Sequence, residues 1–326
     1  MATESQRSLP LDGFARSSVV LAVLAVQLLA FAAAYTVGMP TLYAVFLVVS
    51  AAALGVASRE GAFGVAMATV GSVLLVALGL PLFLFVARQS PSLVAEKAMD
   101  PGVHRVLYLG VYAPFLAAAA SLLFGVPLAY HLARGFPGQE LVESLVDLPL
   151  VVPHSVAGII ILFGFGQGGA FPSLSVLGTL PGMVLALTFV SAPYAVNASR
   201  EAFESVDDRL EYAARVHGAT PWATFRRVTG PLAVRGMVTG GVLAWARSVS
   251  EFGAVAVVAY SVEFFFPLEG SRVVAQHAPV FVYNTYLQGG LDESGAVAAL
   301  LLAVSAAIFL LVRWLTSDTA GTGGLP

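Results

Sequence analysis

Long apolar stretches alternate with short polar connections along most of this chain. Eight of them have the apolar character of membrane-crossing helices, at residues 17–37, 41–57, 62–87, 108–130, 143–166, 181–200, 236–260 and 295–315. A helix of about 20 apolar residues crosses the roughly 30 Å hydrocarbon layer of a bilayer. The pattern predicts an all-α polytopic membrane protein with about eight transmembrane helices. The second stretch is short and the "SREG" connection after it is tight, so the second and third could instead form one broken hairpin.

The basic residues indicate how these helices are oriented, because arginine and lysine concentrate in cytoplasmic connections. With both termini in the cytoplasm, the inner connections hold Arg7, Arg16, Arg59, Arg134, Arg200, Arg209, Arg215, Arg226, Arg227, Arg235 and Arg313. The outer connections hold Arg88, Lys97, Arg105 and Arg272. The charge pattern therefore predicts that the N-terminus and the C-terminus both lie inside.

Composition agrees with a multi-pass protein of the cell (cytoplasmic) membrane. Hydrophobic residues make up 58% of the chain and charged residues 11%, against about 25% charged in soluble domains. The chain has no cysteine, which excludes disulfides and thiolate metal sites. His277 has no second ligand at a suitable spacing, so the sequence predicts no metal site.

One long polar connection, residues 201–235, interrupts the apolar pattern with the stretch "EYAARVHGATPWATFRRVTGPL". Asp208 followed by Glu211 fits a capping box that begins a short helix. Gly218 fits the position just after its end. Thr220 and Pro221 fit the N-cap and first residue of a second helix. The loop is predicted to be two short helices with a bend at Gly218.

The first of these helices carries the small residues Ala213 and Ala214, which let another surface approach the backbone closely. The arginines on its other faces suit water and anionic lipid headgroups, so membrane lipid is an expected partner. Two interpretations stay open on these residues alone. The loop is either an amphipathic hairpin resting on the membrane or its own helices, or a docking site for another protein.

This stretch resembles the EAA loop in the permease subunits of ABC importers. The matching positions are Ala213, Ala214, Gly218 and Pro231, whereas Tyr212 stands where the pattern has glutamate and Gly230 replaces the leucine before the proline. The resemblance implies a type I importer permease core whose loop is a coupling helix that docks on an ATP-binding subunit. The residues implied in this coupling are Glu211, Ala213, Ala214, Gly218, Ala219 and Pro221.

Two flanking segments, "DLPLVVPHSVAGIIILFGFG" at 147–166 and "WARSVSEFGAVAVVAY" at 245–260, resemble permeases for tetrahedral oxyanions. Their form is similar to the molybdate/tungstate branch, with a sulfate or thiosulfate permease as the alternative. The resemblance assigns a permease core to residues 105–320 and leaves residues 1–104, with about three extra helices and an outer loop, outside it. The polar tail at 321–326 is expected to be disordered. No comparable resemblance covers the first three stretches.

The resemblance also implies partner proteins, and it implies that a separate subunit binds ATP. It implies a homodimer, two copies of an ATP-binding subunit, and an extracytoplasmic binding protein that meets residues 88–107 and the outer loop 261–294. No nucleic-acid partner is expected. The chain lacks a Gly-x-x-x-x-Gly-Lys-Ser/Thr run, so it has no phosphate-binding loop, and ATP with magnesium would bind the partner subunit. This chain would not be an enzyme. A stand-alone, ion-coupled secondary transporter is the alternative from another class.

Charges inside the predicted spans are the candidate groups for the translocation path. Arg247 and Glu251 lie at i,i+4 spacing in the stretch 236–260, and they either fix packing or a gate, or contact the anion. Pro149 and Pro153 predict a kink in the stretch 143–166. His154 is then a packing residue, although a broken helix facing a cavity is an alternative. The candidate path residues are Ser155, Ser191, Asn197, Arg247, Ser250 and Glu251.

Overall fold

The computed structural model describes residues 29–39, 41–57, 61–174 and 176–318 of the chain. Its contacts divide the chain into two compact units, residues 1–88 and residues 89–326. Most of the predicted span 17–37 and the whole tail 321–326 lie outside the described residues.

In the first unit, helices α2 (Thr41–Ala57) and α3 (Gly61–Ala87) pack against each other. A small aromatic cluster fills their contact: the ring of Phe31 lies 5.3 Å from the rings of both Tyr43 and Phe83. Both apolar stretches are thus helical, as predicted. With 17 residues, α2 is shorter than the about 20 residues of a full crossing, so a complete crossing by α2 stays a prediction.

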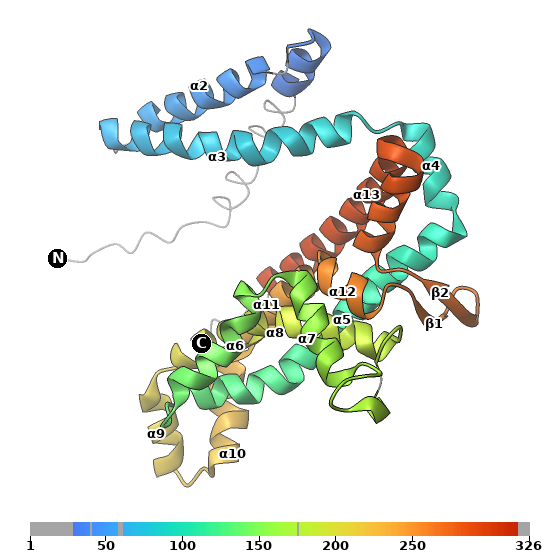
Figure 1. The fold of residues 1–326 in the computed structure, drawn as a ribbon. Helices are drawn as coiled ribbons and strands as arrows, with labels where there is room; N and C mark the ends of the chain where they lie inside the picture. The colour runs from blue at the N-terminus through green and yellow to red at the C-terminus, as the bar shows by residue number, and fades with distance from the viewer. Residues whose placement is uncertain (1–28, 40, 58–60, 175, 319–326) are drawn as a thin grey trace, which may run out of the picture. The chain divides into compact units, whose positions relative to one another are not determined.

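The second unit is built on three long helices that lie side by side: α5 (Pro101–Leu132), α8 (Leu180–Glu204) and α11 (Gly230–Val249) (Figure 1). α13 (Ala278–Asp318) packs against α5 and α11. Among the described residues, α5, α8 and α13 as far as Leu311 are long and apolar enough to cross a membrane, and two bent helix pairs could raise the number from three to five. Eight crossings and the inward position of both termini stay predictions.

The predicted kink in the stretch 143–166 is wrong, because the chain there forms two helices. α6 (Gln139–Val151) and α7 (His154–Phe165) meet at 120°. Proline disfavours the helical conformation of the residue before it, and Val152 accordingly has an extended backbone with ψ 129°. Pro153, which has no N–H to donate, continues the extended conformation with ψ 136°. The broken helix, the less favoured alternative, is what forms.

The stretch 236–260 is also divided. α11 ends at Val249 and the short helix α12 (Gly253–Val258) follows, so Glu251 lies between two helices rather than inside one. α12 packs closely on α7 through two glycines. A Cβ atom on Gly158 would lie 2.8 Å from Cβ of Val257, and one on Gly253 would lie 2.9 Å from Cβ of His154. These breaks therefore place the two helix starts against each other.

The loop 261–294, which is predicted to lie outside, adds a sheet to a fold predicted to be all-α. Strands β1 (Val262–Phe266) and β2 (Ser271–Ala275) form an antiparallel hairpin in which Phe264 pairs with Val273. Val262, Phe264 and Phe266 are buried on one face, as the two-residue period of a strand requires. α13 begins at Ala278, well before the predicted residue 295, and Gly290 interrupts it with φ 79°.

Two ion pairs tie the loop 261–294 to the residues that precede and begin α5. α4 (Pro91–Met99) packs against α13, where Lys97 Nζ lies 2.9 Å from Glu293 Oε2. Arg105 near the start of α5 forms two hydrogen bonds of 2.7 and 2.9 Å to Glu269 in the hairpin turn. A 3₁₀ turn, η1 (Pro172–Leu174), lies in the connection between α7 and α8.

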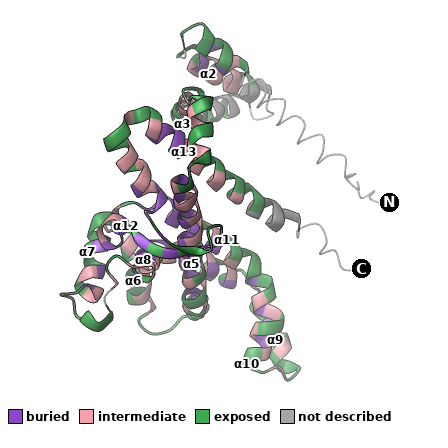
Figure 2. Cartoon of the chain, turned by 90° about the vertical axis from the view of Figure 1, so that its right-hand side faces the viewer, coloured by how far each residue is buried: buried purple, intermediate pink, exposed green. Residues whose placement is uncertain are grey.

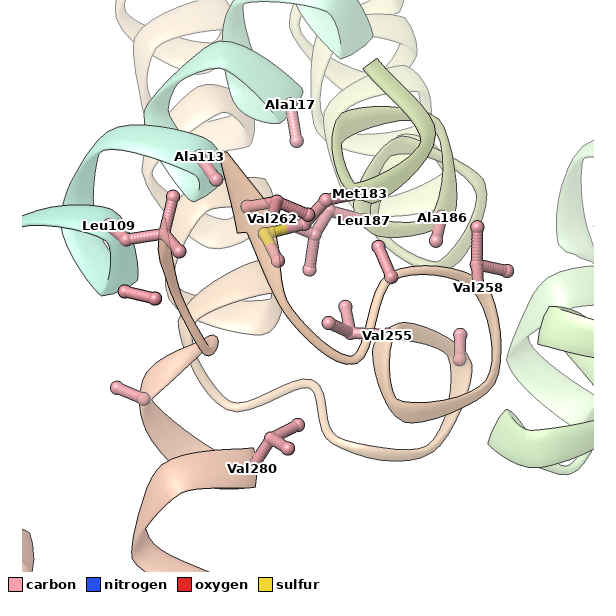
Figure 3. Close-up of a cluster of buried hydrophobic side chains, with 14 of the residues drawn as sticks. Leu109, Ala113, Ala117, Met183, Ala186, Leu187, Val255, Val258, Val262 and Val280 are labelled. Atoms are coloured by element: carbon pink, nitrogen blue, oxygen red, sulfur yellow. The ribbon is translucent and has the colours of Figure 1, made fainter. Parts of the chain in front are cut away.

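The main core lies where α5, α8, α12 and the hairpin converge (Figure 3). Leu109, Met183, Leu187, Val255 and Val258 have essentially no solvent exposure. Because α12 contributes to this core, a movement of α5 or α8 acts directly on the segment that follows Glu251.

Candidate coupling loop and membrane gate

The polar loop forms the two predicted short helices. α9 (Asp208–Val216) and α10 (Pro221–Thr224) are joined at Gly218, whose φ of 86° is a left-handed conformation that glycine adopts without strain. Thr220 is the N-cap of α10, and its Oγ1 accepts a hydrogen bond from the backbone N of Ala223 at 3.2 Å. A π-helical turn, η2 (Phe225–Thr229), then leads into α11.

The predicted capping box of α9 is wrong in its residues. The N-cap is Asp207, whose carboxylate accepts from the backbone N of Arg209 at 2.9 Å. Glu211 does not reach back to the helix start, because its side chain has other partners inside the loop.

Glu211, one of the residues that the resemblance implies in coupling, is buried, with 3% of its surface exposed. Arg134, which follows α5, donates to both carboxylate oxygens; its Nη1 lies 2.6 Å from Oε2, and its Nη2 contacts Oε1. Thr229 donates to Oε1 at 2.6 Å and Arg215 to Oε2 at 3.1 Å. The hydrogen-bonded Arg134 lowers the pKa of Glu211, an effect that burial partly opposes, and the same bond raises the pKa of Arg134.

The outer faces of α9 and α10 present apolar side chains to solvent. Tyr212 and Val216 share one face of α9 at i,i+4 spacing and are 71% and 65% exposed, and Trp222 on α10 is 68% exposed. We call these three residues, with the exposed Leu210, the apolar docking set. Figure 2 shows α9 and α10 as a largely exposed projection of the second unit. Large apolar side chains that are exposed to water on a short projection are a mark of an interaction site.

The other predicted coupling residues lie on this projection as well. Ala213, Gly218 and Pro221 are exposed, and Ala214 and Ala219 are partly exposed. The space around Gly218 is open, since an added Cβ would meet no atom within 4 Å. The loop therefore combines one buried acidic anchor with a surface of small and apolar residues.

A second group of polar residues gathers where the two broken stretches meet, and we call His154, Arg247 and Glu251 the gate cluster. Arg247 Nη2 lies 2.7 Å from Glu251 Oε2 and 2.8 Å from His154 Nε2. His154 Nδ1 lies 3.3 Å from Glu251 Oε2. The other Glu251 oxygen accepts from the backbone N of Ala254, in the first turn of α12, at 2.9 Å.

The gate cluster confirms the predicted pairing of Arg247 with Glu251 and corrects the role expected for His154. The side chain of Glu251 is fully buried, that of Arg247 is 16% exposed, and that of His154 is 53% exposed. His154 is therefore a polar partner on an exposed helix start, not a packing residue. The cluster joins α7 to α11 and α12, with Glu251 as its buried centre.

The remaining path candidates are not gathered at this cluster. Ser250 and Ser155 are exposed beside it, and Ser250 donates to the carbonyl of Arg247 at 2.9 Å. Ser191 is buried between α8 and α5, 3.4 Å from Ser121, which is a helix-packing contact. Asn197 donates to Asp147 at 2.7 Å and so links α8 to α6. A role in the path stays a prediction for each of them.

Sequence reasoning missed Arg134 and Thr229, the partners that hold Glu211. Arg134 lies 77 residues before Glu211 and Thr229 lies 18 residues after it, so no local spacing connects the three. The one available signal was a basic residue directly after a long apolar stretch. Among the described residues, no group of three or more histidine and acidic side chains is arranged to hold a metal ion.

Broken helices that pack against long membrane helices are a recurring feature of transport proteins. Residues 121–317 match the family described as binding-protein-dependent transport system inner membrane component. The chain belongs to this family, which comprises permease subunits of ABC importers.

Individual relatives agree with this assignment. The molybdate/tungstate transport system permease protein of Pyrococcus furiosus is 36% identical over 79% of this chain and 96% of its own length. A sulfate transport system permease protein of Escherichia coli K12 is 34% identical over 61% of this chain and 70% of its own length. A solved bacterial ABC transporter involved in alginate import has the same fold, with a TM-score of 0.58 and 18% identity, over 78% of this chain and 94% of that one.

Proposed function

We propose that this chain is the membrane-spanning subunit of an ATP-driven importer for a tetrahedral oxyanion, molybdate or tungstate. The observation that carries the ATP-driven part is the α9–α10 projection, with its exposed apolar docking set and its buried Glu211 anchor. The substrate class rests on relatives named for molybdate/tungstate transport that align over most of both chains. The sulfate relative, which aligns over less of this chain, supports sulfate as the second candidate substrate.

The proposed assembly is a homodimer in the cell membrane with two ATP-binding subunits inside and an anion-binding protein outside. ATP with magnesium binds the partner subunits, and this chain carries out no bond chemistry. Closure of the two ATP-binding subunits draws the α9–α10 projections together, and the dimer opens outward to receive the anion. This surface suits a groove in another protein. The small residues permit close approach of the two backbones, and the apolar docking set buries apolar surface when the two proteins bind.

The gate cluster is proposed to latch α7 to α12 in the closed state. Arg247 and Glu251 neutralise each other, so the pair binds His154 of α7 without retaining an anion in the path. Opening requires α7 and α12 to separate, which breaks the contacts of Arg247 and Glu251 with His154. Once these contacts break, the N–H groups of His154 and Arg247 become available to a passing oxyanion.

The first experiment is purification of the protein from its native membranes in mild detergent, with identification of accompanying proteins by mass spectrometry. We expect a stoichiometric ATP-binding subunit carrying a phosphate-binding loop. A chain that emerges alone, under conditions that preserve other membrane complexes, and that takes up anion with an ion gradient alone would contradict the proposal.

The second experiment tests the loop with paired variants. Ala214→Glu and Gly218→Trp are expected to abolish ATP-driven uptake, because each adds bulk or charge at a surface that the partner approaches. Ala214→Ser and Gly218→Asn are the matched controls, since serine adds one atom and asparagine tolerates the left-handed conformation. Unchanged uptake in both disruptive variants would remove the coupling assignment. Calorimetry with the accompanying binding protein then ranks molybdate, tungstate and sulfate.

A further inference from the structure

Three separate parts of the chain converge on the carboxylate of Glu211. Arg134 follows α5, Arg215 belongs to α9 itself, and Thr229 ends η2 at the start of α11. Each donates to an oxygen of a side chain with 3% exposure. A bidentate arginine–carboxylate pair is directional as well as strong, because both groups are planar. The arrangement fixes α9 relative to the end of α5, a helix to which it is not adjacent in sequence.

A series of aromatic ring contacts connects Arg134 to the exposed surface of the loop. The Arg134 guanidinium lies over the ring of Tyr130, 4.8 Å from its centre. The Tyr130 ring meets that of Phe225 edge to face at 5.2 Å, and Phe225 stacks on Trp222 at 5.8 Å. Trp222 is an exposed member of the apolar docking set. We call Tyr130, Arg134, Glu211, Phe225 and Thr229 the junction.

We propose that the junction is a strut that carries the movement of the α9–α10 projection to α5, with Glu211 as a positioning residue rather than a contact to the ATP-binding subunit. The proposal rests on the proposed function, since it presumes that the projection is moved by ATP hydrolysis. The loop is covalently joined only to α8 and α11. The strut adds the third long helix of the core, so that all three helices move with the loop.

The packing of α5 determines which part of the protein this movement reaches. Ala113 and Ala117 of α5 lie in the same buried cluster as Ala254 and Val255 of α12 (Figure 3). The amide of Ala254 in turn binds Glu251 of the gate cluster. Close-packed interiors transmit a displacement rather than absorb it. A displacement of Arg134 at the inner end of α5 thereby reaches the segment that holds the gate cluster.

The test uses the complete importer in proteoliposomes with its binding protein, and compares oxyanion uptake with ATP hydrolysis in the same vesicles. Glu211→Gln and Arg134→Met are expected to lower the number of anions taken up per ATP at least about fivefold, the lower end of typical coupling between sites. The apparent KM for the binding-protein–anion complex should not change. The exchanged pair Arg134→Glu with Glu211→Arg should recover part of the lost ratio.

Further variants keep the test decisive if a pair variant does not fold. Arg134→Lys keeps the charge without the planar two-point contact, and Thr229→Val removes one hydrogen bond while keeping the shape. Both are expected to lower the ratio while the ATP-binding subunit still co-purifies. Arg209→Met, at an exposed arginine of the same helix, is the control expected to keep the ratio.

The possible results separate this inference from the proposed function. If the unaltered complex shows no ATP-driven uptake, the proposed function fails. If the unaltered complex transports and the folded Arg134 and Glu211 variants keep its ratio of anions to ATP, the strut is refuted and the proposed function stands.

Discussion

Replacement of Glu251 by glutamine tests the gate cluster most directly. Glutamine has the same shape and can still accept from the amide of Ala254, but it leaves the guanidinium of Arg247 without its counter-charge. Glu251 is fully buried and Arg247 is 16% exposed, so solvent replaces little of the lost interaction. Removing one partner of a buried ion pair costs about 3–5 kcal/mol. Because the backbone hydrogen bond survives, we expect the lower end of this range, about 3 kcal/mol.

This cost can be measured as a shift in thermal unfolding of the detergent-solubilised protein. For a unit of this size, 1 kcal/mol corresponds to about 2–4 °C in Tm, so Glu251→Gln should lower Tm by about 6–12 °C. The double variant Arg247→Met/Glu251→Gln removes both charges and keeps an acceptor for the amide of Ala254. It should lie close to the unaltered protein in stability, because no buried charge is left unpaired.

Thermal stability and tight closure to anions should be affected differently in these two variants. If the pair is a latch, the double variant is stable and yet loses tight closure, which an anion-leak assay in proteoliposomes detects. A Glu251→Gln protein with a Tm within about 2 °C of the unaltered protein would refute the energetic reasoning. A stable double variant that transports with normal tightness would refute the latch.

Three other predictions follow from the same geometry. Gly218→Val should destabilise the loop by about 1–2 kcal/mol because of the left-handed backbone, whereas Gly218→Asn should keep the ATP-binding subunit bound in co-purification. The pKa of Glu211 is lowered in the folded protein, so its stabilising charge is present above its ordinary pKa of 4.5 and is lost only as pH falls through the lowered value. The difference in Tm between the unaltered protein and Glu211→Gln should therefore stay constant from about pH 7.5 to 5.5, and a difference that shrinks around pH 6.5 would contradict this. Gly253→Leu should force α7 from α12 and abolish uptake, whereas Gly164→Ala, whose Cβ would meet nothing within 4 Å, should leave uptake unchanged.

Local sequence signals predicted the loop well, because single residues with special backbone preferences determine its turns. Gly218 supplies the left-handed bend, and Thr220 with Pro221 begins the second helix. The pairing of Arg247 with Glu251 was likewise visible from their spacing. These features depend on neighbours within four residues and need no knowledge of the rest of the fold.

Features that depend on distant neighbours were missed or misjudged. Glu211 was assigned to a helix cap, but its partner Arg134 comes from a separate helix that only the fold brings near. The prolines at 149 and 153 fitted both a kink and a break. The break forms where the glycine-lined start of α12 packs against α7, so that the two short helices bury each other. The hairpin at 262–275 was hidden because its alternating pattern is only five residues long on each strand.

The π-helical turn η2 makes the length of the loop matter as much as its composition. The backbone N of Gly230 bonds to the carbonyl of Phe225, so this turn holds one residue more than an α-helical turn would. Each residue of an α-helix turns the chain by about 100°. Loss of a single residue between Phe225 and Thr229 would close the turn and rotate everything before it relative to α11. Substitutions of the exposed Arg226 and Arg227 should thus be tolerated where a one-residue deletion is not, because the deletion changes the direction in which α9 and α10 project.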